Sequence, residues 1–153
     1  ALAVADSLEA LGAEVRVQTA IFMQQIAEPY IRNKAVRHLE KGRIVIFGCG
    51  TGSPFFSTDT AAVLRGAEIG ADVVLMAKNI DAIYTDDPRK NPDAKKLSEV
   101  DYDYILKNHL SAIDTCAASF AMDNHMKLHI FGLDDSENIY RVIMGEKIGT
   151  IVD

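Results

Sequence analysis

The chain has 153 residues, of which 48% are hydrophobic and 25% are charged, and this is enough apolar material for one folded core. A formal net charge of −6 argues against a broad surface for nucleic acid or for anionic membranes. No apolar run approaches the roughly 18–20 residues that a membrane-spanning helix needs. We therefore predict a single domain, residues 1–153, in a soluble cytoplasmic protein that binds neither nucleic acid nor membranes.

The cysteines and histidines show no metal-binding pattern. Cys49 and Cys116 lie far apart in the sequence, and neither belongs to a Cys-x-x-Cys pair. The four histidines lack the spacing of known ligand motifs. The sequence therefore predicts no metal site built by the protein alone and no disulfide framework.

The first third of the chain predicts two helices and a strand. Residues 1–11 carry apolar side chains at helical spacing and end before Gly12, a common C-terminal stop. Residues 14–19 alternate between apolar and polar, which indicates a short strand. Residues 31–39 again show helical spacing after a proline.

Two continuous apolar runs follow, at residues 43–47 and 72–76, with a helical pattern at residues 60–69 between them. The second run is typical of a strand that is buried on both faces of a parallel sheet. Helices and strands alternate up to this point. The order predicts an α/β layer fold with right-handed crossovers.

Residues 78–97 contain two prolines and many charged residues, and they predict loops and turns. This excursion follows the end of a predicted strand, where ligands of open α/β sheets collect, although a solvated surface loop explains its composition equally well. The later elements are two helices, a strand, a helical turn and a last strand, predicted within residues 98–110, 112–124, 128–131, 139–143 and 149–152.

Residues 48–58 form a turn between a predicted strand and a predicted helix, and they contain three glycines and four hydroxyl side chains. Glycines let the backbone approach an anion, and the first N–H groups of the next helix point toward it. A tight turn in which Thr58 or Asp59 caps the helix explains the same residues without a ligand. The adjacent Phe55 and Phe56 favour the ligand, because a flat ring or base would cover them.

This loop, from Gly50 to Asp59, resembles the nucleoside monophosphate loop of bacterial uridylate (UMP) kinases, which are members of the amino acid kinase superfamily. Residues 71–79, 80–88 and 144–150 continue the resemblance in the family's order, so that it covers essentially the whole chain. The resemblance implies a three-layer α/β/α fold with a mainly parallel sheet. It also implies transfer of the γ-phosphoryl group of ATP to UMP, giving UDP and ADP in de novo pyrimidine nucleotide synthesis.

The resemblance assigns the UMP site to the loop and the ATP site to the polar excursion. Lys78 or Asn79 is expected near the adenine, Tyr84 against the base or ribose, and Asp87 as an acceptor for ribose hydroxyls. The choice between Lys78 and Asn79 stays open. The residues expected to bind UMP are Thr51, Gly52, Ser53, Pro54, Phe55, Phe56, Ser57 and Thr58.

The same resemblance implies that Asp59 and Asp114 are the acids that matter for turnover, with Mg²⁺ accompanying ATP. On its position alone, Asp114 is better explained as an acid in the N-cap or first turn of a helix, where the helix dipole stabilises it. The family further implies a homo-oligomer, usually a hexamer, with GTP or UTP as effectors.

Two motifs of the family, a Lys-Leu-Ser-Gly turn and a Gly-Gly-Gly loop, do not occur in the chain. We therefore expect the chain to be the C-terminal part of a UMP kinase, with a fold that is incomplete at the N-terminus, and to be catalytically defective by itself. One alternative is another amino acid kinase, acting on carbamate, aspartate or glutamate, although the loop offers no arginine for a carboxylate. A second alternative is a nucleotide-binding regulator without catalytic activity.

Overall fold

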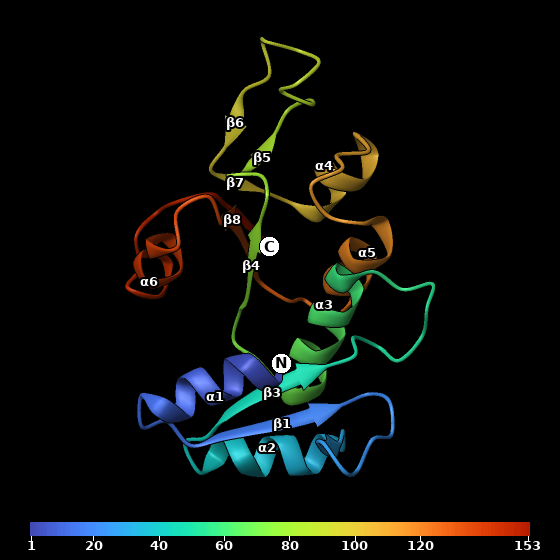
Figure 1. Cartoon of the computed structure of the whole chain (residues 1–153). Coiled ribbons are helices and arrows are strands. Elements are labelled where there is room, and N and C mark those ends of the chain that lie inside the picture. Colours follow the sequence, from blue (N-terminus) through green and yellow to red (C-terminus); the bar gives the residue numbers. More distant parts are fainter. The chain divides into compact units, whose positions relative to one another are not determined.

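The computed structural model describes all of residues 1–153 (Figure 1). The chain divides into two compact units, Ala1–Ala61 and Ala62–Asp153. The single domain that the sequence predicts therefore stays a prediction.

The first unit is built on a parallel sheet of three strands in the order β2-β1-β3. The central strand pairs along its whole length with β3, from Val15 opposite Ile44 to Thr19 opposite Gly48. The elements of this unit are α1 (Leu2–Ala10), β1 (Val15–Thr19), β2 (Glu28–Pro29), α2 (Arg32–Glu40) and β3 (Ile44–Gly48). All of them except the two-residue β2 are predicted by the sequence.

The two helices of this unit cover opposite faces of the sheet (Figure 1). Neighbouring residues of a strand point to opposite faces. Accordingly, Thr19 lies with Ala1, at the start of α1, around Gly48. Gln18, one residue earlier, donates to Glu28, which also contacts His38 of α2.

Helix α3 (Thr58–Ile69) begins in the first unit and continues into the second. The second unit has a mixed sheet in the order β4-β8-β9-β7, formed by β4 (Val74–Lys78), β7 (Glu99–Val100), β8 (Leu128–Gly132) and β9 (Thr150–Val152). The pairs β4–β8 and β7–β9 are parallel, and β8–β9 is antiparallel. Its other elements are the antiparallel hairpin of β5 (Ile83–Tyr84) and β6 (Lys96–Leu97), and the helices α4 (Tyr102–Lys107), α5 (Thr115–Asp123) and α6 (Glu137–Ile143).

The core of the second unit gathers where α5 meets the sheet. Ala117, Ala118 and Ala121 of α5 are fully buried, and so are Leu128 and Ile130 of β8. The small side chains on α5 allow the helix to lie close to its neighbours, and their burial supplies a driving force in proportion to the apolar area removed from water.

Three sequence predictions need correction in this unit. Strand β4 is not buried on both faces, since Met76 is buried while Leu75 is 37% exposed. Residues 78–97 contain the β5–β6 hairpin rather than loops alone. Residues 98–110 hold a short strand before a short helix, because Asp101 accepts a hydrogen bond from the N–H of Tyr104 at 2.6 Å and thereby starts α4 late.

The predicted α/β fold with mainly parallel strands is confirmed. No helix of the structure is both long and apolar enough to cross a lipid bilayer.

Candidate functional site

The loop between β3 and α3 turns with a left-handed backbone. The φ angles of Cys49, Gly50 and Gly52 are +66°, +57° and +79°. The N–H of Gly52 donates to the carbonyl of Cys49 at 3.0 Å and closes the turn. A side chain on Gly52 would also approach Ala20 to 3.4 Å. That separation is an ordinary van der Waals contact, so it is the left-handed backbone that calls for glycine at this position.

Ser57 is the N-cap of α3. Its hydroxyl oxygen accepts a hydrogen bond from the N–H of Thr60 at 3.0 Å, and its carbonyl accepts from the N–H of Ala61 at 3.1 Å. The alternative in which Thr58 or Asp59 caps the helix is therefore wrong, because both belong to its first turn. There the carboxylate of Asp59 is favoured by the positive end of the helix dipole.

The remainder of the loop presents rings and donors to the solvent. The side chain of Phe55 is 98% exposed and that of Phe56 is 51% exposed. The hydroxyl of Thr51 accepts from the N–H of Ser53 at 3.2 Å, so it shapes the loop from within. This arrangement can bind an anion through backbone and hydroxyl groups beside a planar ring.

The second unit contains a cavity of about 560 Å³ beside the β5–β6 hairpin. Its volume is in the range of about 300–1,000 Å³ that is typical of small-molecule sites. Tyr84 and Asp87, two of the residues expected at the ATP, line this cavity. Its wall also contains apolar residues and charged residues, namely Ile80, Ala82, Ile83, Leu110, Ala112, Asp86, Arg89 and Lys90.

Lys78 and Asn79, the other two residues expected at the ATP, do not line the cavity. Lys78 reaches the adjacent loop instead, where its ammonium group donates to the carbonyl of Ala112 at 2.7 Å. Asn79 is exposed. Lys78 thus supports a residue of the cavity wall, and the choice between the two as contacts of adenine stays open.

The charged end of the cavity is an ordered turn. Asp87 accepts a hydrogen bond from the N–H of Arg89 at 3.0 Å, and its other oxygen lies 3.5 Å from the ammonium of Lys90. Asp86 accepts from the side-chain amide of Asn91 at 2.9 Å and from the N–H of Asp87 at 2.7 Å. These two bonds, the amide first, hold the pKa of Asp86 below its usual value.

Asp114 is the N-cap of α5. Its carboxylate accepts a hydrogen bond from the N–H of Ala117 at 2.9 Å, and its carbonyl accepts from Ala118 at 2.9 Å. The helix-start interpretation of Asp114 is therefore confirmed, while a catalytic role for it stays a prediction. Asp59 belongs to the first unit and Asp114 to the second.

Sequence reasoning did not anticipate that residues 108–112 contribute to the cavity wall. His109 in this loop has a left-handed backbone, with a φ of +51°. Histidine adopts this conformation more often than most residues do, but such positions are uncommon, so a single histidine is too weak a signal to locate one. Arg89 and Lys90 did carry a signal, since two adjacent cations follow the Asp-Pro pair.

No group of three or more histidine, cysteine, aspartate or glutamate side chains is arranged to hold a metal ion. Magnesium that arrives with ATP needs only one or two protein carboxylates. The expectation of Mg²⁺ therefore stays a prediction about the substrate, Mg·ATP.

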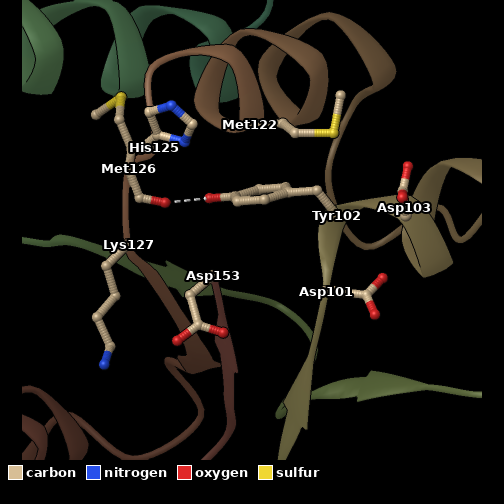
Figure 2. Close-up of a pocket in the computed structure, with 8 residues that line it drawn as sticks. All are labelled: Asp101, Tyr102, Asp103, Met122, His125, Met126, Lys127 and Asp153. Carbon is tan, nitrogen blue, oxygen red and sulfur yellow. Dashed lines mark hydrogen bonds between the residues drawn. The ribbon is translucent and has the colours of Figure 1, made fainter.

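A second cavity, of about 350 Å³, lies beside Tyr102 (Figure 2). The phenol of Tyr102 donates to the carbonyl of Met126 at 2.6 Å. Burial, followed by the nearby carboxylate of Asp153, raises the pKa of Tyr102 above its usual value. None of the expected site residues lines this cavity.

Comparison with known proteins shows which family the chain resembles. The model of the amino acid kinase family matches residues 1–132. A UMP kinase from Bacillus anthracis is 38% identical to this chain in sequence. The match covers 93% of this chain and 59% of that protein, with a TM-score of 0.88. A UMP kinase from Ureaplasma parvum is 30% identical, with coverages of 99% and 65% and a TM-score of 0.92.

A uridylate kinase from Archaeoglobus fulgidus is 29% identical, with coverages of 82% and 59% and a TM-score of 0.66. The chain thus spans less than two thirds of the length of each of these proteins. The match of the family model to residues 1–132 shows that the chain belongs to the amino acid kinase family.

Proposed function

We propose that this chain is part of a UMP kinase, which transfers the γ-phosphoryl group of Mg·ATP to UMP and releases UDP and ADP. The observation that carries the proposal is the 38% identity, over 93% of the chain, to a protein whose structure is described as a UMP kinase. Since the chain spans 59% of that protein, the activity proposed is that of the whole enzyme.

In this proposal the loop of the first unit binds UMP. The N-terminus of α3 and the left-handed turn at residues 49–52 offer backbone N–H groups to the phosphate. The exposed rings of Phe55 and Phe56 cover the uracil. Contact with the base would explain why the two phenylalanines are exposed in the free protein.

The cavity of the second unit binds ATP. Tyr84 lies in its wall and packs against the base or ribose. Asp87 accepts from ribose hydroxyls, because a carboxylate has about four lone-pair positions and its two bonds leave room for more. Arg89 and Lys90 supply positive charge for the phosphates.

Phosphoryl transfer requires positioning and neutralisation of charge more than covalent chemistry. We assign Asp59 and Asp114 to the orientation of the catalytic cations. The N-cap bonds of Asp114 hold its carboxylate in one place, which suits such a role. Bound magnesium neutralises charge on the transferring phosphoryl group.

From the resemblance of the sequence to UMP kinases we further propose a homohexameric enzyme of pyrimidine nucleotide synthesis, in the cytoplasm, with GTP or UTP as effectors. These are proposals for the whole protein.

The test is ADP release by the full-length protein with Mg·ATP and a panel of acceptors: UMP, CMP, AMP, GMP, carbamate, aspartate and glutamate. A strong preference for UMP is expected. Release with carbamate or an amino acid alone would contradict the assignment of the loop to UMP and leave the ATP cavity intact. No release with any acceptor, together with tight nucleotide binding, would favour a regulator.

A further inference from the structure

The β5–β6 hairpin that forms part of the cavity wall is held at two successive residue pairs. In its register Ile83 lies opposite Leu97, and Tyr84 lies opposite Lys96. The first pair is tied to β9 by Thr150, whose hydroxyl accepts from the N–H of Ile83 at 2.8 Å and donates to the carbonyl of Leu97. Thr150 is fully buried, so this tie is part of the core.

The second pair is tied by the carboxylate of Asp81. The phenol of Tyr84 donates to both oxygens of Asp81, at 3.0 and 3.2 Å, and the ammonium of Lys96 donates to one of them at 2.9 Å. The hydrogen bond from Lys96 holds the pKa of Asp81 below its usual value. The hydrogen bond to Asp81 raises the pKa of Tyr84. Both directions agree with an ionised carboxylate shared by a phenol and an ammonium.

The backbone of Asp81 lies against Gly132, the last residue of β8. A Cβ on Gly132 would lie 3.1 Å from the Cα of Asp81 and 3.3 Å from its Cβ, so a side chain there would require Asp81 to shift by a few tenths of an ångström. Asp81 does not line the cavity, although its neighbours Ile80 and Ala82 do. Its carboxylate therefore acts on the cavity through Tyr84.

An ion pair of this kind contributes little to folding stability, because the side chains of Lys96 and Asp81 are 44% and 50% exposed. Its effect falls on the tyrosine ring, whose orientation is restricted when the phenol is bonded. A ring that is already oriented loses less conformational freedom when a ligand packs against it.

We propose that Asp81 is a positioning residue for nucleotide binding, which holds the ring of Tyr84 at the cavity wall without touching the nucleotide. The proposal rests on the assignment of this cavity to ATP. Asp81 and its partner Lys96 both lie outside the cavity lining.

The experiment measures the Kd of ATP and the KM and kcat of the full-length protein for Asp81→Ala, Tyr84→Phe and their double variant. Tyr84→Ala, which removes the whole ring, tests whether the ring contacts ATP at all. Asp81→Ala and Tyr84→Phe are each expected to weaken ATP binding about three- to tenfold, the size expected for one hydrogen bond. The double variant should be no weaker than either single one, because both changes remove the same bond. The KM for ATP should rise while kcat stays within about twofold. Asp81→Asn keeps an acceptor for the phenol and should recover most of the affinity.

The matched control is Asp103→Ala, which removes an exposed pair with Lys107 at 3.7 Å on α4 and should leave ATP binding unchanged. A spectrophotometric titration supplies an independent readout: the raised pKa of Tyr84 should return toward its usual value in Asp81→Ala and not in Asp103→Ala.

The positioning role is wrong if Asp81→Ala binds ATP as the parent does while Tyr84→Ala binds it weakly, or if the Asp81 and Tyr84→Phe effects add. The assignment of the cavity to ATP is wrong if Tyr84→Ala leaves ATP binding unchanged. The two failures are therefore distinguishable.

Discussion

Gly149 lies so close to Ile130 that no side chain fits between them. A Cβ on Gly149 would stand 2.0 Å from the carbonyl oxygen of Ile130 and 2.9 Å from the Cβ of Phe131, and the φ of Gly149 is +79°. Both neighbours belong to β8, at the centre of the second unit.

Replacing this glycine should therefore destabilise the protein strongly. We expect Gly149→Ala to lower the free energy of unfolding by about 3 kcal/mol or more, because backbone strain and overpacking act together. Gly145→Ala is the matched control, since Gly145 also has a positive φ, of +90°, but nothing lies within 4 Å of its added Cβ. Urea unfolding of both variants measures the difference, and equal losses would contradict the role of the close contact.

Loss of the N-cap of α3 should weaken both the helix and the proposed UMP site. Ser57→Ala removes the acceptor of the Thr60 N–H and should lower the free energy of unfolding by about 1 kcal/mol. Ser57→Asn retains a capping oxygen and should restore stability. If UMP binding is recovered along with stability, the hydroxyl acts through the helix; if it is not, the hydroxyl contacts UMP directly.

Removing an exposed ring should affect binding and leave folding intact. Since Phe55 is 98% exposed, Phe55→Ser should change the free energy of unfolding by no more than about 0.5 kcal/mol. In the proposed function it should weaken UMP binding several-fold and leave ATP binding unchanged. Calorimetric titration with each nucleotide tests this expectation. Unchanged UMP affinity would show that the ring does not cover the base.

Tyr102 should make stability depend on alkaline pH. Burial raises its pKa, so its contribution is fully present below the usual tyrosine value of 10.0 and is lost as pH rises, because the unfolded phenol ionises first. Tyr102→Phe loses the bond to Met126 and should cost about 1–2 kcal/mol at neutral pH.

The parent protein should then lose stability more steeply above pH 10 than the phenylalanine variant does, when unfolding is followed by circular dichroism. Parallel pH profiles of the two proteins would contradict the assignment to Tyr102.

The sequence predicts the elements that carry a clear periodicity. The alternation of residues 14–19 locates β1, and helical spacing locates α1 and α2. Strands of two residues, such as those of the β5–β6 hairpin, are too short to show any period, and their positions depend on distant partners such as Thr150. The exposed face of β4 was missed for a related reason, since a continuous apolar run does not reveal how many faces are covered.

In the candidate site, too, local patterns were predictable from the sequence and tertiary contacts were not. A local pattern of glycines and hydroxyls indicates the loop, and the structure finds a left-handed turn and a helix start there. The capping residue was placed one or two positions too late, at Thr58 or Asp59 instead of Ser57, because neighbouring hydroxyl and carboxyl side chains are nearly equivalent as caps. The contribution of residues 108–112 to the cavity arises from tertiary packing, which no local pattern records.

The tie between Ile83 and Thr150 joins residues that are 67 positions apart. The ribosome synthesises the chain from its N-terminus onward, at about 5–20 residues per second. Several seconds therefore pass between synthesis of Ile83 in the β5–β6 hairpin and synthesis of Thr150 in β9, which anchors it. The loop at residues 48–58 depends only on residues made before it or just after it. During synthesis the protein should therefore form the loop at residues 48–58 early and the cavity wall last. Proteolysis of arrested chains should cut the β5–β6 hairpin until Thr150 has emerged from the ribosome.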